Sequence, residues 1–86
     1  MNKKFFRDFA TWLDQWLQTN VGEDPQRLKQ FPVEFSGDEL KPIAILRVFL
    51  YIDRHHWSAP QQKTADIFHS SRWKIGRAIK KYLNFM

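Results

Sequence analysis

The chain has no cysteine, which excludes a disulfide scaffold, a zinc site built from thiolates and a thiol nucleophile. It also lacks any run approaching the roughly 20 apolar residues of a membrane-spanning helix. The apolar residues near the N-terminus are interrupted by Arg7, Asp8 and Asp14, and no small-residue cleavage site follows, so a signal peptide is not expected. We therefore expect a soluble, cytoplasmic protein.

The signatures of catalytic sites are missing as well. The sequence contains no glycine-rich phosphate loop, no nucleophile motif and no cluster with metal-ligand spacing. His55 and His56 are adjacent and cannot share a helix face, so they are expected to end a helix rather than to bind a metal. We expect neither an enzyme nor a metal or other cofactor.

The charge is distributed unevenly over the 86 residues, a length that suits one domain. Residues 1–53 hold seven basic and eight acidic residues, whereas residues 54–86 hold seven basic residues and a single acid, Asp66. The net charge is therefore −1 in the first part and +6 in the second. A surface that binds a polyanion would produce this asymmetry, and so would a solvated basic helix face.

Residues 3–19 have the pattern of an amphipathic helix with an unusually aromatic apolar arc. Aromatic residues make up 16% of the chain, which argues against disorder. Part of this arc is a candidate homodimer interface, and the alternative is packing inside the same chain over a central helix. The interface candidates are Phe5, Phe9, Trp12 and Trp16.

The connector over residues 20–36 is punctuated by glycine and proline. Asp24 can cap a short helix that begins at Pro25 and runs to about Gln30. In residues 31–35, phenylalanine and valine alternate with proline and glutamate, a pattern that allows a short extended piece.

The next helix is expected to start sharply, because Ser36 and Glu39 have the spacing of a capping box. It runs to about Arg54, and its apolar residues cover nearly the whole circumference. A helix that is apolar all round is buried on several sides, so this one is expected to be the central helix.

Two more helices follow. Ser58 and Gln61 repeat the capping-box spacing and predict a helix from Ala59 to Phe68. After a tight break, Ser71 is the expected cap of a last helix over residues 72–83. The sequence thus predicts one all-α domain of four to five helices. It comprises an N-terminal helix and connector in residues 1–35 and a core of three helices in residues 36–86.

Residues 61–80, QQKTADIFHSSRWKIGRAIK, resemble the helix-turn-helix class of DNA-binding proteins. Small Ala65 stands where the two helices of that class cross, and Phe68 supplies the buried apolar residue three positions later. Ser71 matches the serine that caps the second helix, and Ile75 is the β-branched residue expected ten positions after the alanine. The turn departs from the pattern, with His69 where glycine is usual and serine at the next position. The resemblance implies a recognition helix that enters the major groove.

The last helix divides into an aliphatic arc and a basic arc, and no acidic residue occurs from position 72 to the end. In this class the N-terminal part of the recognition helix faces the base edges, which nominates Arg72, Trp73 and Arg77 as readers. The expected phosphate contacts are Lys63, Thr64, Lys74, Lys80 and Lys81. Gly76 lies at the edge of the basic arc and is expected to permit the close approach of a backbone, either that of a nucleic acid or that of a neighbouring helix.

These features favour a small regulator of transcription that binds double-stranded DNA. A second reading is a protein-binding adaptor or inhibitor of the phage or plasmid type, in which the aromatic arc and Trp73 contact a partner and the basic helix meets an acidic surface. A third reading is RNA binding through the same basic face.

Overall fold

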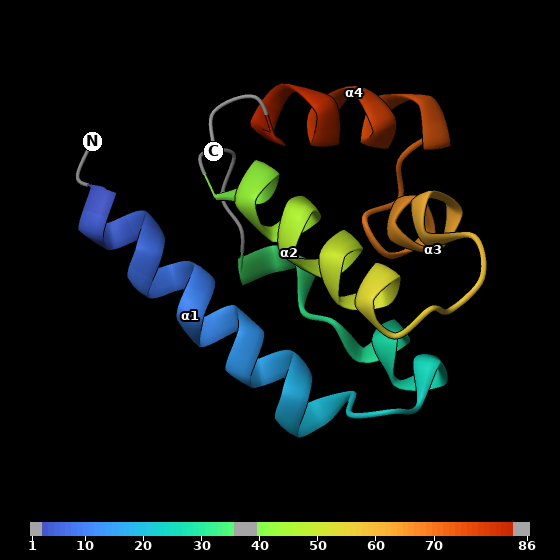
Figure 1. The fold of residues 1–86 in the computed structure, drawn as a ribbon, viewed down its shortest axis with the longest axis horizontal. Coiled ribbons are helices and arrows are strands. Elements are labelled where there is room, and N and C mark those ends of the chain that lie inside the picture. The colour runs from blue at the N-terminus through green and yellow to red at the C-terminus, as the bar shows by residue number, and fades with distance from the viewer. Residues whose placement is uncertain (1–2, 36–39, 84–86) are drawn as a thin grey trace.

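The computed structural model describes residues 3–35 and 40–83. Within these ranges the chain forms helices and no strand, which confirms the expected all-α fold (Figure 1). The elements are α1 (Lys3–Asn20), the 3₁₀ segments η1 (Pro25–Gln30) and η2 (Val33–Phe35), α2 (Lys41–Arg54), α3 (Pro60–Ile67) and α4 (Arg72–Leu83).

Helix α2 is the centre of the fold, as its apolar circumference predicts. It packs against α1 on one side and against α3 and α4 on the other (Figure 1). Six of its residues are buried, namely Ala44, Ile45, Leu46, Val48, Tyr51 and Ile52. Because three helices surround it, α2 gives α4 a rigid support on which to present its outer face.

One hydrophobic core runs through all four helices and the connector. Leu13 and Leu17 of α1 are fully buried, Leu28 joins them from η1, and Ile75 and Ile79 enter from α4. The aromatic arc of α1 is continuous with this core, since the ring of Trp16 meets that of Phe31 edge-on at 5.6 Å. Burying these side chains supplies most of the stability of so short a chain.

Two of the predicted caps are confirmed. The Asp24 carboxylate accepts a hydrogen bond from the Gln26 amide at 3.0 Å at the start of η1. The Ser71 hydroxyl accepts one from the Lys74 amide at 3.1 Å at the start of α4. Each bond satisfies an amide that has no partner inside its helix.

Other predicted helix starts and strands differ. Ser58 does not cap α3, whose N-cap is Ala59 in the left-handed region (φ +49°), and its hydroxyl instead accepts a bond from Lys63. Residues 33–35 form η2 and not an extended piece. The predicted capping box of Ser36 and Glu39 lies outside the described residues, and α2 itself begins at Lys41 without a side-chain cap.

The histidines close α2, as predicted. His56 adopts the left-handed conformation (φ +58°), and the Trp57 amide donates to the Ile52 carbonyl at 3.3 Å. The Nδ1 atom of His55 lies 2.8 Å from the Tyr51 carbonyl oxygen. This arrangement satisfies carbonyls that a helix end leaves open.

Candidate nucleic-acid interface

Residues 61–80, which resemble the helix-turn-helix class in sequence, fall on helices α3 and α4 and the turn between them. Figure 1 shows α3 nearly end-on and α4 from the side, so the two axes cross steeply. Ala65, Phe68 and Ile75 are all buried and belong to the common hydrophobic core.

The turn between them shows how histidine replaces the usual glycine. His69 adopts the left-handed conformation with φ +52°. The Ser70 amide donates to the Ala65 carbonyl at 2.9 Å, and the His69 amide donates to the Asp66 carbonyl at 3.4 Å. These two bonds are those of a Schellman motif, which satisfies the last carbonyls of α3 and redirects the chain into α4. The strain at a non-glycine residue does not prevent the turn.

The outer face of α4 carries a continuous set of exposed side chains, which we name the α4 ridge. Its core-facing residues Ile75 and Ile79 are buried, so the ridge points away from the fold. The ridge consists of Arg72, Trp73, Lys74, Arg77, Lys80 and Lys81, all exposed. The separation of arcs expected from the sequence therefore holds for the described side chains of α4.

Trp73 and Arg77 form a stacked pair at the middle of the ridge. The guanidinium carbon of Arg77 lies 4.8 Å from the centre of the Trp73 ring, within the range of a cation–π interaction. Trp73 is nonetheless 66% exposed. Each side chain therefore restrains the other while both stay accessible to a partner.

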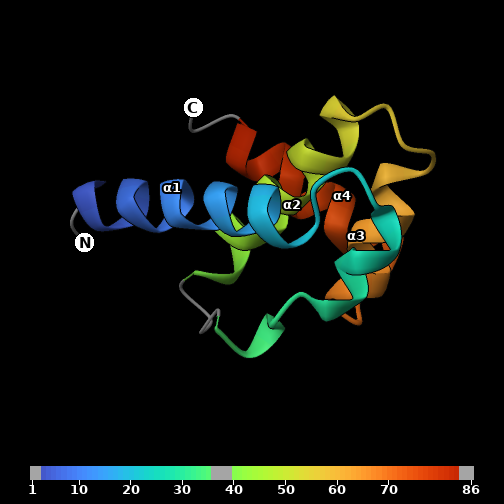
Figure 2. The ribbon, with the colours of Figure 1, turned by 90° about the horizontal axis from the view of Figure 1, so that it is seen from below.

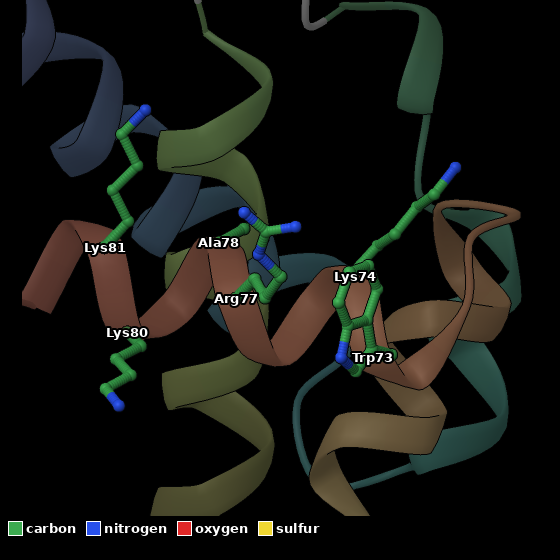
Figure 3. Close-up of a pocket in the computed structure, with 6 residues that line it drawn as sticks. All are labelled: Trp73, Lys74, Arg77, Ala78, Lys80 and Lys81. Carbon is green, nitrogen blue, oxygen red and sulfur yellow. The ribbon is translucent and has the colours of Figure 1, made fainter.

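Lysines flank this pair on both sides. Figure 3 shows Lys74 and Lys81 extending to one side of α4 and Lys80 to the other, with Trp73 and Arg77 between them. These side chains surround a shallow hollow on the surface of α4, and all six residues that line it belong to that helix. The lysine ammonium groups on the flanks suit the phosphates of a polyanion. The tryptophan and guanidinium at the centre suit flat groups with hydrogen-bond acceptors, such as the base edges in a groove.

The ridge is electrostatically uncompensated within the described residues. Their ion pairs join Arg27 to Asp24 and Arg47 to Asp14, and none involves a basic group of the ridge. The nearest acid in sequence, Asp66, accepts a hydrogen bond from Gln62 at 2.9 Å. The positive charges of α4 therefore add to one field.

Gln61 belongs to this face, although the sequence suggested only a capping role for it. It lies in a second hollow that α3 and α4 share, with Arg72, Gly76 and Lys80. A Cβ atom on Gly76 would stand 2.4 Å from the Gln61 side-chain nitrogen, so the glycine makes room for this amide. The neighbour at Gly76 is thus a side chain of α3, whereas the sequence led us to expect a backbone. Only the crossing of the helices reveals this neighbour.

Of the two phosphate contacts predicted on α3, Thr64 is wrong, whereas Lys63 stays a prediction. Thr64 has no exposed surface, and its hydroxyl donates to the Pro60 carbonyl at 2.7 Å, so it cannot meet a phosphate. The ammonium group of Lys63 donates to the Ser58 carbonyl and to the Ser58 hydroxyl. Lys63 also lines a separate groove beside η1, away from the ridge. Lys74, Lys80 and Lys81 remain as flanking cations.

The aromatic arc of α1 divides into two parts. Phe9 and Trp16 are half-buried against the core, while Phe5 and Trp12 are 50% and 42% exposed. The rings of Phe9 and Trp12 are stacked, with centres 6.0 Å apart. The N-terminal turns of α1 project beyond the other helices (Figure 2). The inner half of this arc therefore joins the core, whereas Phe5 and Trp12 keep a large part of their surfaces exposed.

The described part of the chain contains neither a cluster of metal-ligating side chains nor a helix able to span a membrane. It holds no group of three or more histidine or acidic side chains able to bind a metal ion. None of its helices combines the length and the hydropathy required to cross a bilayer. No family model, curated protein or solved structure matches this chain.

Proposed function

We propose that the protein is a small cytoplasmic DNA-binding protein, a regulator of transcription, that inserts α4 into the major groove of duplex DNA. The observation that carries this proposal is the α4 ridge, in which Trp73 and four basic residues lie opposite the buried face of the helix and Arg72 is exposed at its first position. An α-helix about 10–12 Å across fits a major groove about 12 Å wide.

The layout of the ridge supports a division of roles. Arg72 and Trp73 lie in the first turn of α4 and Arg77 follows one turn after Trp73, in the half of the helix that approaches the base edges in helix-turn-helix proteins. Lys74, Lys80 and Lys81 lie on the flanks of the helix (Figure 3), where the phosphates of the two strands would pass. Helix α3 then crosses the backbone, with Gln61 next to the ridge.

The first experiment is a salt titration of duplex binding. If five basic residues per protomer displace counterions, the logarithm of affinity falls against the logarithm of salt concentration with a slope of about −4 to −5. Fluorescence anisotropy with a labelled duplex measures this slope, and a double-stranded RNA competitor tests the choice of nucleic acid. A flat response, or stronger competition by RNA, would contradict the proposal.

The exposed half of the α1 arc favours a second candidate, a protein-binding adaptor. Phe5 and Trp12 expose large apolar surfaces that DNA binding by α4 does not use. In this reading the basic helix α4 also meets an acidic surface of the partner, so the triple variant Arg72→Ala, Arg77→Ala and Lys80→Ala separates the two functions. Loss of the duplex complex supports DNA binding, whereas unchanged duplex binding together with the loss of a protein complex supports the adaptor.

A further inference from the structure

The stacked pair of Trp73 and Arg77 suggests which DNA sequence the ridge would prefer, an inference that rests on the proposed function. Arg77 lies at the centre of the exposed arc of α4, opposite the buried Ile75 and Ile79. Its guanidinium is held 4.8 Å from the centre of the Trp73 ring. The pair therefore presents two different chemical groups side by side at the point that reaches deepest into a groove.

Arginine has a clear partner among the base edges. Its planar fork of donors matches the O6 and N7 acceptors of guanine, the most common specific contact in the major groove. Stacking on Trp73 limits the orientations of this fork before binding, so less rotamer freedom is lost on contact. The geometry favours guanine over the other three bases opposite Arg77.

Trp73 offers an apolar surface, because Arg77 covers only part of a ring that is 66% exposed. The apolar group that a base pair displays in the major groove is the C5-methyl of thymine. A tryptophan beside the arginine fork therefore complements this methyl group.

The spacing of the pair restricts where the two contacts fall. Successive base pairs are about 3.4 Å apart along the duplex, and pairs two steps apart are about 6.8 Å apart. A guanine and a thymine belong to different base pairs, because guanine pairs with cytosine, and the 4.8 Å between the Arg77 guanidinium carbon and the centre of the Trp73 ring is nearer to one step than to two. The contacts therefore fall on neighbouring base pairs.

We propose that Trp73 and Arg77 together read a guanine and the methyl group of a thymine in the adjoining base pair. The same chemistry would accept 5-methylcytosine at the methyl-bearing position. Lys74, Lys80 and Lys81 contribute affinity through the phosphates but do not contribute to this preference.

The test begins with duplexes that the full-length protein selects from a random-sequence pool. In the selected site, the thymine next to the guanine is replaced by deoxyuridine, which removes only the methyl group. Burying one methyl stabilises a complex enough that its loss should weaken binding about threefold to fivefold. A thymine elsewhere in the duplex, replaced in the same way, is the matched control and should have no effect.

The same two duplexes are then measured with Trp73→Ala and Arg77→Lys. The alanine variant should lose the distinction between thymine and deoxyuridine, because its apolar surface is gone. The lysine variant keeps its charge and should retain the salt slope while losing roughly tenfold or more of its preference for guanine. Helical content measured by circular dichroism confirms that both exposed substitutions leave the fold intact.

Equal binding of the thymine and deoxyuridine duplexes by the wild-type protein would overturn the inference and leave the proposed function standing. Tighter binding of single-stranded than of duplex DNA would also overturn it, since it would assign Trp73 to stacking on an unpaired base. Absence of any salt-dependent duplex binding would remove the proposed function itself.

Discussion

Helices α1 and α4 are both amphipathic and both pack on α2, but they treat their outer faces differently. The polar arc of α1 carries charges of both signs, and its Asp14 forms an ion pair with Arg47 of α2 at 3.8 Å. The polar arc of α4 carries only positive charge within the described residues, and no acid neutralises it. The spacing of apolar residues determines which face of a helix is buried. The sign of the charge on the exposed face indicates which kind of partner that face can attract.

The largest expected effect is a loss of stability when a core side chain of α1 or α4 is removed, because both helices pack into the same hydrophobic core. Leu13 of α1 and Ile75 of α4 are each 1% exposed. Replacing either by alanine removes packed methyl groups and leaves a cavity, so each variant should lose about 2–5 kcal/mol of unfolding free energy. Urea denaturation followed by circular dichroism measures this loss. A loss below about 1 kcal/mol at either position would show that its helix does not belong to the common core.

The tryptophans sharpen the contrast between the helices. Trp16 is half-buried and meets Phe31, whereas Trp73 is 66% exposed. Trp16→Ala should destabilise the fold by about 2 kcal/mol, and Trp73→Ala should change it by less than about 0.5 kcal/mol. Denaturation curves of the two variants provide the comparison. Equal losses would mean that α4 packs its ridge against the fold.

A hydrogen bond between Tyr51 of α2 and Gly22 in the turn after α1 makes the stability of the fold fall at alkaline pH. The buried Tyr51 hydroxyl donates to the Gly22 carbonyl at 2.5 Å. Burial, with a smaller contribution from Glu23, raises the pKa of Tyr51 above its usual 10.0. The neutral phenol is thus favoured in the folded state, and its contribution is fully present below pH 10 and lost as the pH rises through the raised pKa.

Tyr51→Phe checks this link. The variant should lose about 1 kcal/mol at neutral pH, because the Gly22 carbonyl loses its donor. It should also show a weaker decline in stability above pH 10 than the wild type does. Denaturation midpoints at neutral and alkaline pH measure both effects, and parallel pH profiles for the two proteins would refute the assignment.

The smallest expected changes in stability come from substitutions in the turns that follow α1 and α3. Gly22 after α1 and His69 after α3 both adopt the left-handed conformation, with φ +58° and +52°. Glycine tolerates this region without a Cβ penalty, so Gly22→Ala should destabilise and His69→Gly should stabilise the fold, each by about 1 kcal/mol or less. Thermal unfolding of both variants measures the two signs. A stabilising Gly22→Ala would contradict the backbone geometry.

The amino-acid pattern predicted most of the helices and the faces they bury. The alternation of arcs along α1 and α4 is a local property, and so are the caps at Asp24 and Ser71, which depend on atoms two or three residues away. The cap predicted at Ser58 was wrong, because α3 begins at Pro60 and its N-cap is Ala59. The Ser58 oxygens accept hydrogen bonds from Lys63 instead.

The errors in the candidate site arise from contacts that sequence spacing does not contain. Thr64 is polar, and yet it is buried because its hydroxyl bonds to a carbonyl one turn earlier. Gln61 joins the ridge because α3 crosses α4 at Gly76, a relation between helices 15 residues apart in sequence. Exposure of Trp73 also required the position of α2 and α3, since a tryptophan is as suitable for a core as for a surface.

The most direct test of the central claim compares two sets of three lysine or arginine residues that change the net charge equally. The first variant replaces Lys74, Lys80 and Lys81 of the ridge by alanine, and the second replaces Lys29, Lys41 and Arg54, which are also exposed but lie outside α4. Duplex binding is measured over a range of salt concentrations. We expect the ridge variant to reduce the salt slope by about 2.7 and the second variant to leave it nearly unchanged. Equal reductions in both variants would contradict the account.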